Sequence, residues 1–268
     1  MLALISSLAF ADDSLLNRPD APVQVGLHAE LGALAVLSHT IQFSQDGSEI
    51  DYVREGGQDN LFPFTRLSAD VHRGRNTVVF LYQPLAIRSS AVATRDLVVD
   101  GQTFPEGTPM DFVYDFPFYR ASYLRQLGQG PGELAVGASL QIRNADIEFS
   151  SADGTMRRAN RNIGPVPALK FRAHKPLDSG FFLGAEVDGM YAPIKYLNGD
   201  AEADVVGAIV DASLRAGVEL NHGGEAFVNL RYLAGGASGT DPNTRGLGDG
   251  YTENWLNFVT LSLGASLK

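Results

Sequence analysis

The chain has no cysteine, and its 268 residues include only five histidines. The lack of thiols excludes disulfide bonds, cysteine nucleophiles and thiolate metal sites. No run of about 18 consecutive apolar residues occurs, which excludes a transmembrane helix. The sequence also contains no nucleophile elbow, HExxH zinc motif or phosphate-binding loop. We therefore expect a non-enzyme with no catalytic residues, no metal site and no cofactor.

Long segments of alternating polarity are the main feature that the sequence does have. In residues 205–220 every even position is apolar, whereas the odd positions include Asp211, Arg215 and Glu219. A period of two is typical of a β-strand with one apolar and one polar face. This strand is about twice as long as a usual strand of a soluble protein. Its length and polarity favour the wall of a membrane barrel, between lipid and a polar lumen.

The same alternation recurs along the chain, in residues 23–37, 66–72, 134–143, 169–174, 181–191, 226–232 and 259–267. Short links rich in turn residues, at 72–76, 129–132, 176–180 and 221–224, alternate with longer polar links near 46–60, 88–111, 151–162, 197–204 and 239–253. Four short and five long connections predict an all-β fold, a single closed antiparallel up-and-down transmembrane β-barrel of about ten strands. Residues 97–104 leave twelve strands open as an alternative, and residues 77–87 fit two registers.

The N-terminal residues indicate where the protein is located. Residues 1–11 are mostly apolar, and Ala9-Phe10-Ala11 fits the small-x-small cleavage pattern of an export signal. We interpret 1–11 as the remnant of a signal peptide, 12–22 as a periplasmic segment and 23–268 as the barrel. Short turns are expected on the periplasmic side and long loops outside, in the outer membrane of a Gram-negative bacterium.

Charged residues of both signs occupy the faces predicted to line the lumen. The candidate ionic network or constriction is Glu30, Arg66, Asp70, Arg120, Arg143, Arg172, Glu186, Asp188, Asp211, Arg215, Glu219 and Arg231, and His28 and Lys170 share these faces. Buried ions need partners, and side chains can largely fill a barrel of this size. The pattern favours a salt-bridge plug. The alternative is a narrow polar pore with a charged constriction.

Aromatic residues gather near the predicted strand ends on the loop side. They include Phe62, Phe64, Phe112, Tyr114, Phe116, Phe118, Tyr119, Tyr191, Tyr196, Tyr251 and Trp255. This clustering predicts an aromatic girdle at the outer membrane interface. The alternative is an aromatic core cluster in a soluble sandwich.

With the second link counted as residues 88–115, the five long links carry a net charge of −10, which equals that of the whole chain. Acidic loops repel nucleic acid, so we expect no nucleic-acid partner. Carboxylate oxygens are the ligands that hard divalent cations prefer, which makes these loops candidate cation sites at a lipopolysaccharide surface. A solvated acidic surface is the simpler interpretation. The other expected partners are outer-membrane lipid and the barrel-insertion machinery.

Three functional hypotheses fit these observations. The first is a structural barrel or narrow passive pore for small solutes. The second is a surface-facing hydrolase that uses rim carboxylates and His39, the histidine nearest the predicted outer half. The third is a soluble secreted β-sandwich. Asp70 and His72 share a strand face, as an acid–base pair requires, but they lie at the predicted periplasmic end.

Residues 103–125 carry a resemblance to known proteins. They contain Thr103-Phe104-Pro105-Glu106-Gly107-Thr108-Pro109, then Tyr114-x-Phe116 and Tyr119-Arg120-x-x-Tyr123. With the alternating C-terminal strand, this resembles a group of small, porin-like bacterial outer-membrane β-barrel proteins. The resemblance implies a fold and a location but supplies no activity or substrate. The C-terminal Leu267-Lys268 departs from the terminal Phe or Trp that is common in such barrels.

Overall fold

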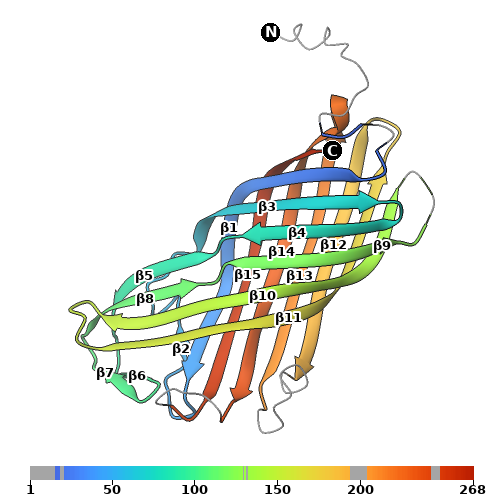
Figure 1. Cartoon of the computed structure of the whole chain (residues 1–268). Helices are drawn as coiled ribbons and strands as arrows, with labels where there is room; N and C mark the ends of the chain where they lie inside the picture. Colours follow the sequence, from blue (N-terminus) through green and yellow to red (C-terminus); the bar gives the residue numbers. More distant parts are fainter. Residues whose placement is uncertain (1–15, 19–20, 129, 131, 194–203, 243–247) are drawn as a thin grey trace, which may run out of the picture.

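The computed structural model describes residues 16–18, 21–128, 130, 132–193, 204–242 and 248–268. Ten long strands pair in antiparallel order and close into a barrel (Figure 1). These are β1 (Gln24–Phe43), β3 (Leu61–Arg73), β4 (Asn76–Gln83), β9 (Phe118–Gln126), β10 (Glu133–Ser151), β11 (Arg157–Pro176), β12 (Phe181–Pro193), β13 (Val206–Glu219), β14 (Gly224–Thr240) and β15 (Tyr251–Leu267). The ten-stranded barrel is confirmed, and the sandwich and twelve-stranded alternatives are wrong. The predicted signal segment 1–11 lies outside the described residues. None of the helices in the described ranges is long and apolar enough to cross a membrane.

The two ends of the barrel differ in their connections. We call the end with the short links β3–β4, β9–β10, β11–β12 and β13–β14 the turn end, and the opposite end the loop end (Figure 1). The β13–β14 link contains a 3-10 turn, η1 (Asn221–Gly223). One predicted long link, 151–162, is wrong, because β10 and β11 stay paired up to Ser150 and Arg157 and are joined by a tight turn.

Further strands extend the barrel at the loop end. β5 (Ala86–Val92) and β8 (Pro109–Asp115) pair with each other, and β8 pairs with the loop-end half of β10. β6 (Leu97–Val99) and β7 (Gln102–Phe104) form a separate hairpin, so residues 97–104 lie outside the wall. β2 (Ile50–Asp51) pairs with β1. Figure 1 shows β5 and β8 alongside the loop-end part of β10, with the β6–β7 hairpin at the same end of the molecule.

A β-bulge in β1 reverses which residues face the interior. The register with β15 shifts between Val36 and Ser38. On the turn-end side of the bulge, Glu30 and Leu34 are buried, whereas beyond it the buried residues are His39 and Ile41. One extra residue in a strand has this effect because side chains alternate with a period of two. The bulge therefore turns His39 into the barrel.

The loop-end half of the interior is filled by an apolar core rather than by polar groups. Its buried members include Leu34, Val36, Ile41, Phe43, Tyr52, Phe64, Leu85, Ile87, Phe104, Met110, Phe112, Tyr114, Phe118, Phe149, Leu256 and Phe258. The girdle prediction is therefore wrong for Phe64, Phe112, Tyr114 and Phe118. The cause is strand periodicity. Phe64 lies on the same inward strand face as Arg66, and Phe118 lies on the same inward strand face as Arg120. Tyr119 and Tyr191 are exposed, and Tyr196 lies outside the described residues.

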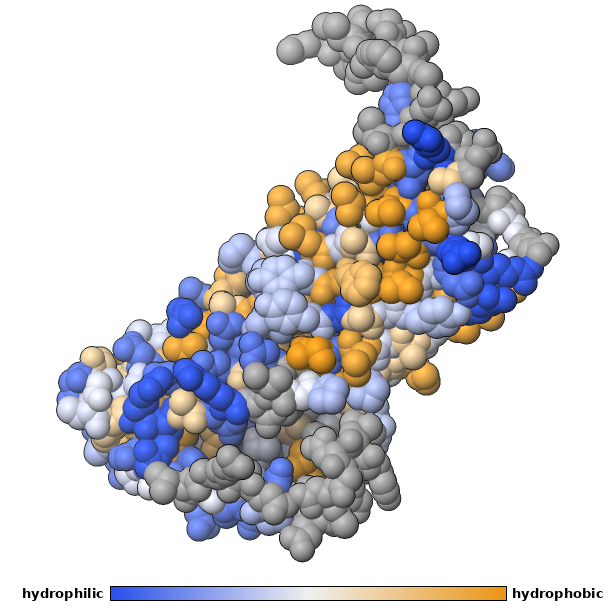
Figure 2. Space-filling model, in the orientation of Figure 1, coloured by the Kyte–Doolittle hydropathy of each residue, from blue (hydrophilic) through white to orange (hydrophobic). Residues whose placement is uncertain are grey.

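The outer surface of the turn-end half is apolar. The large exposed side chains include Leu27, Leu31, Leu67, Phe80, Leu140, Leu169, Leu183, Leu214, Leu230, Leu261 and Leu263. On the face seen in Figure 2, hydrophobic side chains gather toward the turn end and hydrophilic ones toward the loop end. The register of 77–87 follows this pattern, with Val78, Phe80 and Tyr82 exposed and Val79 and Leu81 buried. The apolar rows thus form an outer belt, and the charged rows face the interior.

Candidate functional site

Asp211 is the centre of an ionic network that crosses the middle of the lumen. Its carboxylate accepts from Arg66 Nη1 at 3.3 Å and from Arg120 Nη1 at 2.9 Å, and it pairs with Arg231. The three arginines come from β3, β9 and β14, whereas Asp211 lies on β13. Because β3 and β9 are not sheet neighbours of β13, two of these ion pairs bridge the lumen.

A second carboxylate, Asp188, lies opposite Asp211 in the register of β12 and β13 and extends the network. Arg120 Nη1 also lies 2.8 Å from Asp188 Oδ2, and Lys170 Nζ lies 2.8 Å from the same oxygen. Lys170 pairs with Glu186 as well. Lys170 and Asp188 are direct partners in the register of β11 and β12, which explains their close approach.

Neutral polar groups complete the network, and sequence reasoning did not select them. Gln83 Oε1 accepts from Arg66 at 2.8 Å, and Gln141 Oε1 accepts from Arg120 Nη2 at 2.7 Å. Glu30 accepts from Asn229 Nδ2 at 2.7 Å and from Ser262 Oγ at 2.8 Å. The sequence pattern could have identified two of these groups, because Gln141 and Asn229 alternate with apolar neighbours and therefore lie on inward strand faces.

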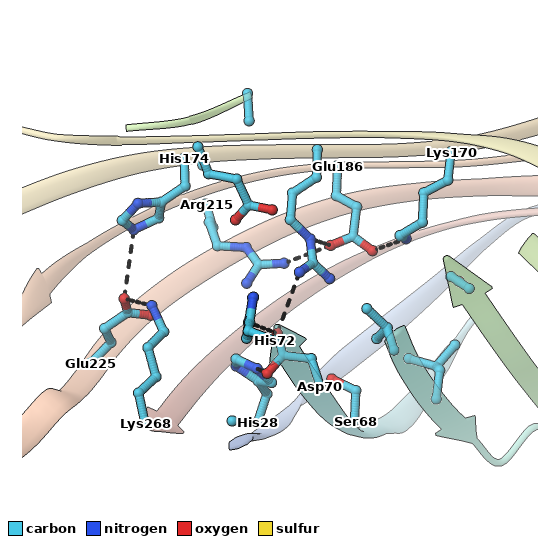
Figure 3. Close-up of a pocket in the computed structure, with 18 of the residues that line it drawn as sticks. His28, Ser68, Asp70, His72, Lys170, His174, Glu186, Arg215, Glu225 and Lys268 are labelled. Atoms are coloured by element: carbon cyan, nitrogen blue, oxygen red, sulfur yellow. Dashed lines mark hydrogen bonds and ion pairs between the residues drawn. The ribbon is translucent and has the colours of Figure 1, made fainter. Parts of the chain in front are cut away.

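At the turn end, the network gives way to an open hollow of about 330 Å³. Figure 3 shows His28, Asp70 and His72 together on one side, with Glu186, Arg215 and Lys170 facing them. The two oxygens of Asp70 lie 3.2 Å from His28 Nε2 and 3.2 Å from His72 Nε2. The carboxylate is therefore flanked by two imidazoles.

Each of these imidazoles also contacts a hydroxyl group. His28 Nδ1 is 2.9 Å from Ser266 Oγ, and His72 Nδ1 is 2.9 Å from Thr77 Oγ1. Both ring nitrogens of each histidine thus face a protein group, an arrangement that ties β1, β3, β4 and β15 together. The expected Asp70–His72 pair does form, and its geometry is that of a cross-strand tie.

Another cluster of polar groups in the hollow lies near Lys268. His174 Nε2 lies 3.6 Å from Glu225 Oε1, and Lys268 pairs with the same oxygen. Glu225 shares its face with Asn229 and Arg231, so the period of β14 was the signal that would have identified it.

The structure brings ten of the twelve predicted lumen residues together. Glu30, Arg66, Asp70, Arg120, Arg172, Glu186, Asp188, Asp211, Arg215 and Arg231 all take part in its ion pairs. Glu219 is exposed at the turn end of β13, opposite Glu225 in the register. The Arg143 side chain lies outside the described part of the structure.

His39 is enclosed in the apolar core at the loop end. Its Nδ1 lies 2.6 Å from Gln58 Oε1, and its ring centroid lies 4.3 Å from that of Tyr52 and 4.4 Å from that of Tyr114. The side chain is fully buried. Within the described ranges, no group of three or more acidic or histidine side chains is arranged to hold a metal ion.

Comparisons with known proteins agree with this fold. No family model matches the chain, and no curated protein matches it. The crystal structure of the outer membrane protease OmpT from Escherichia coli is similar, with 11% identity, 91% of this chain and 96% of that chain covered, and a TM-score of 0.51. The chain has an outer-membrane β-barrel fold.

Two further solved structures are similar at lower scores. The toluene transporter TodX of P. putida has 9% identity, with 94% of this chain and 91% of that chain covered and a TM-score of 0.31. A FadL homologue of Pseudomonas aeruginosa has 13% identity, with 93% and 65% covered and a TM-score of 0.36. At these identities the likeness concerns the fold alone.

Proposed function

We propose that the chain is a structural outer-membrane barrel with a closed lumen. The observation that carries this proposal is that two layers of side chains, one ionic and one apolar, fill the interior of the barrel. The ionic network around Asp211 occupies the middle of the lumen, and the apolar core occupies the loop-end half. A conducting path for ions needs continuous water or polar lining, and these two layers leave neither.

The membrane location is part of the same proposal. The apolar belt on the turn-end half has the character of a lipid-facing surface. The fold shared with OmpT supports a place in a bacterial outer membrane. We propose that the turn end faces the periplasm, and that lipid covers the belt up to the level of the bulge in β1. Lipopolysaccharide, the barrel-insertion machinery and divalent cations at the acidic loops stay predictions from the sequence.

We also propose that the chain is not an enzyme. The hydrolase hypothesis needs an imidazole that a substrate can reach from the outer rim. Gln58, Tyr52 and Tyr114 surround His39, so the ring is a packing element of the core in this structure.

Single-channel recording in planar bilayers tests the closed lumen. We expect no steady current through the purified protein. Arg120→Gln removes one network cation yet leaves the apolar core intact, so we expect this variant to be silent as well. A steady current through the native protein, altered in ion selectivity by Arg120→Gln, would show a pore and contradict the proposal.

A further inference from the structure

The turn-end hollow is lined by many cationic side chains, although the protein as a whole is acidic. Its lining contains six cations, Arg66, Arg120, Lys170, Arg172, Arg215 and Lys268, and five carboxylates, Glu30, Asp70, Glu133, Glu186 and Glu225. The whole chain has a net charge of −10. Three histidines in the same lining add proton-binding groups. Asp188 and Asp211 are not in this lining but pair with Arg66, Arg120 and Lys170, so Arg172, Arg215 and Lys268 are the cations whose charge bears most on the hollow.

One carboxylate, Glu186, is shared by three cations. Lys170 pairs with Oε1, whereas Arg172 Nε and Arg215 Nη2 lie 3.3 Å and 3.4 Å from Oε2. Lys170 also pairs with Asp188, whereas Arg215 has no other ion pair among the described residues. Both guanidinium contacts are long for charge-assisted hydrogen bonds. Arg172 has a second long contact, 3.4 Å to Asp70. The two arginines thus keep donor capacity for another anion.

The position of Arg215 is built into the fold. Gly184 lies opposite Arg215 in the register of β12 and β13. A Cβ atom at Gly184 would lie 2.6 Å from Arg215 Cγ and 3.0 Å from its Cδ, so the stem occupies space that only glycine leaves. On the other side, the guanidinium carbon lies 5.1 Å from the centre of the Phe227 ring. The space left by Gly184 and the cation–π contact with Phe227 together direct the Arg215 guanidinium group into the hollow.

We propose that this hollow binds a small phosphate or phosphomonoester between Arg172 and Arg215. A phosphate dianion carries three acceptor oxygens, and guanidinium groups bind such oxygens in a bidentate way. The volume of about 330 Å³ admits a small molecule rather than a polymer. The phosphate group comes either from free solute or from a lipid headgroup, and the chemistry of recognition is the same.

Titration calorimetry with inorganic phosphate tests the site on the full chain in alkyl maltoside micelles. We expect saturable binding, and we expect Arg215→Gln to weaken it about tenfold or more, because a hydrogen bond to a charged group is lost. Gly184→Ala should weaken binding through displacement of Arg215. Gly189→Ala on the same strand is the matched control, because its Cβ meets only a backbone oxygen at 3.9 Å.

Two readouts make the outcome decisive. Resistance of the barrel to trypsin identifies variants that fail to fold, and Arg215→Lys then serves as the milder second variant, with retained charge and reduced affinity. Equal affinity in phospholipid nanodiscs indicates a free solute, whereas loss of phosphate binding there indicates that headgroups fill the site. No saturable binding in micelles, or equal affinity of the native protein and Arg215→Gln, would overturn the proposal.

Discussion

At the scale of single residues, the interior depends on carboxylates that each serve several cations. Asp211 is buried and contacts Arg66, Arg120 and Arg231. Removing a charge from water is costly unless its partners are in place. The network is therefore sensitive to the loss of one member in a way that an exposed ion pair is not.

Asp211→Asn should destabilise the barrel strongly. The change leaves three buried guanidinium groups short of one negative charge, and loss of one partner of a buried ion pair costs about 3 to 5 kcal/mol. The free energy of unfolding in urea, measured in lipid vesicles, is the readout. Asp178→Asn, in the exposed β11–β12 turn, is the control and should change that free energy by less than about 0.5 kcal/mol. Equal effects of the two substitutions on the free energy of unfolding would contradict the central position of Asp211 in the ionic network.

At the scale of elements, the β1 bulge keeps residues on both of its sides in contact with the interior. Leu34 and Val36 before the bulge, and Ile41 and Phe43 beyond it, all belong to the apolar core. One extra residue makes this arrangement possible, because it changes which sequence positions face inward. The sequence around Leu37 reads as an uninterrupted apolar run, so period alone gave no sign of the shift.

Deletion of Leu37 together with Ser38 should disrupt the loop-end core. His39 would then follow Val36 directly, so His39 and Ile41 would point outward if the turn-end pairing is kept. We expect this variant to lose trypsin resistance at the loop end or to fail to fold. Deletion of Leu37 alone removes only the extra residue and leaves Ser38 and His39 opposite their present partners on β15, so this control should keep the core. A double-deletion variant as protease-resistant as the native protein would refute this account of the two faces.

The segment that follows β2 is held at the loop end by an ion pair. Arg95 Nε donates to Glu55 Oε1 at 2.8 Å, and this hydrogen bond lowers the pKa of the Glu55 carboxyl below its ordinary value. Because the pKa of Glu55 is lower in the folded state than in the unfolded state, the ion pair stabilises the fold at pH values above the ordinary carboxyl pKa. This stabilisation is lost as the pH falls through the lowered pKa of the folded state.

Acidification should therefore loosen residues 50–58 in the native protein more than in Arg95→Gln. Amide hydrogen exchange across the acid range, corrected for its intrinsic pH dependence, measures this. In Arg95→Gln we expect faster exchange at neutral pH and a smaller further increase in acid. If both proteins show the same acid-dependent increase, the Glu55–Arg95 pair does not hold the segment.

At the scale of the whole molecule, the barrel has an apolar belt around its turn-end half and a polar network within it. The loop-end half reverses this arrangement, with an apolar core inside and hydrophilic side chains outside (Figure 2). A soluble-type core thus continues directly from a membrane-type wall. This change of character along one set of strands supports a barrel that projects beyond the lipid at its loop end.

The sequence predicted the wall and most of the ionic network because both follow from a period of two. Arg66, Asp188 and Asp211 alternate with apolar neighbours and could be placed on an inward face directly. Aromatic composition favours an outer position for Phe64 and Phe118, but strand periodicity places them inward, on the faces that carry Arg66 and Arg120. The hollow at the turn end could not be predicted, since it depends on contacts between strands far apart in the sequence, such as Arg172 with Asp70.

The most direct test of the central claim is the environment of neighbouring residues on one strand. The chain has no cysteine, so single cysteines can carry spin labels without background. Leu214 and Leu263 are 64% and 69% exposed, whereas their neighbours Ser213 and Ser262 are 3% and 2% exposed. In bilayers we expect labels at Leu214 and Leu263 to collide with lipid-dissolved oxygen and not with a water-soluble nickel chelate, and labels at Ser213 and Ser262 to collide with neither. Collision of the leucine-site labels with the chelate would contradict a lipid-facing belt.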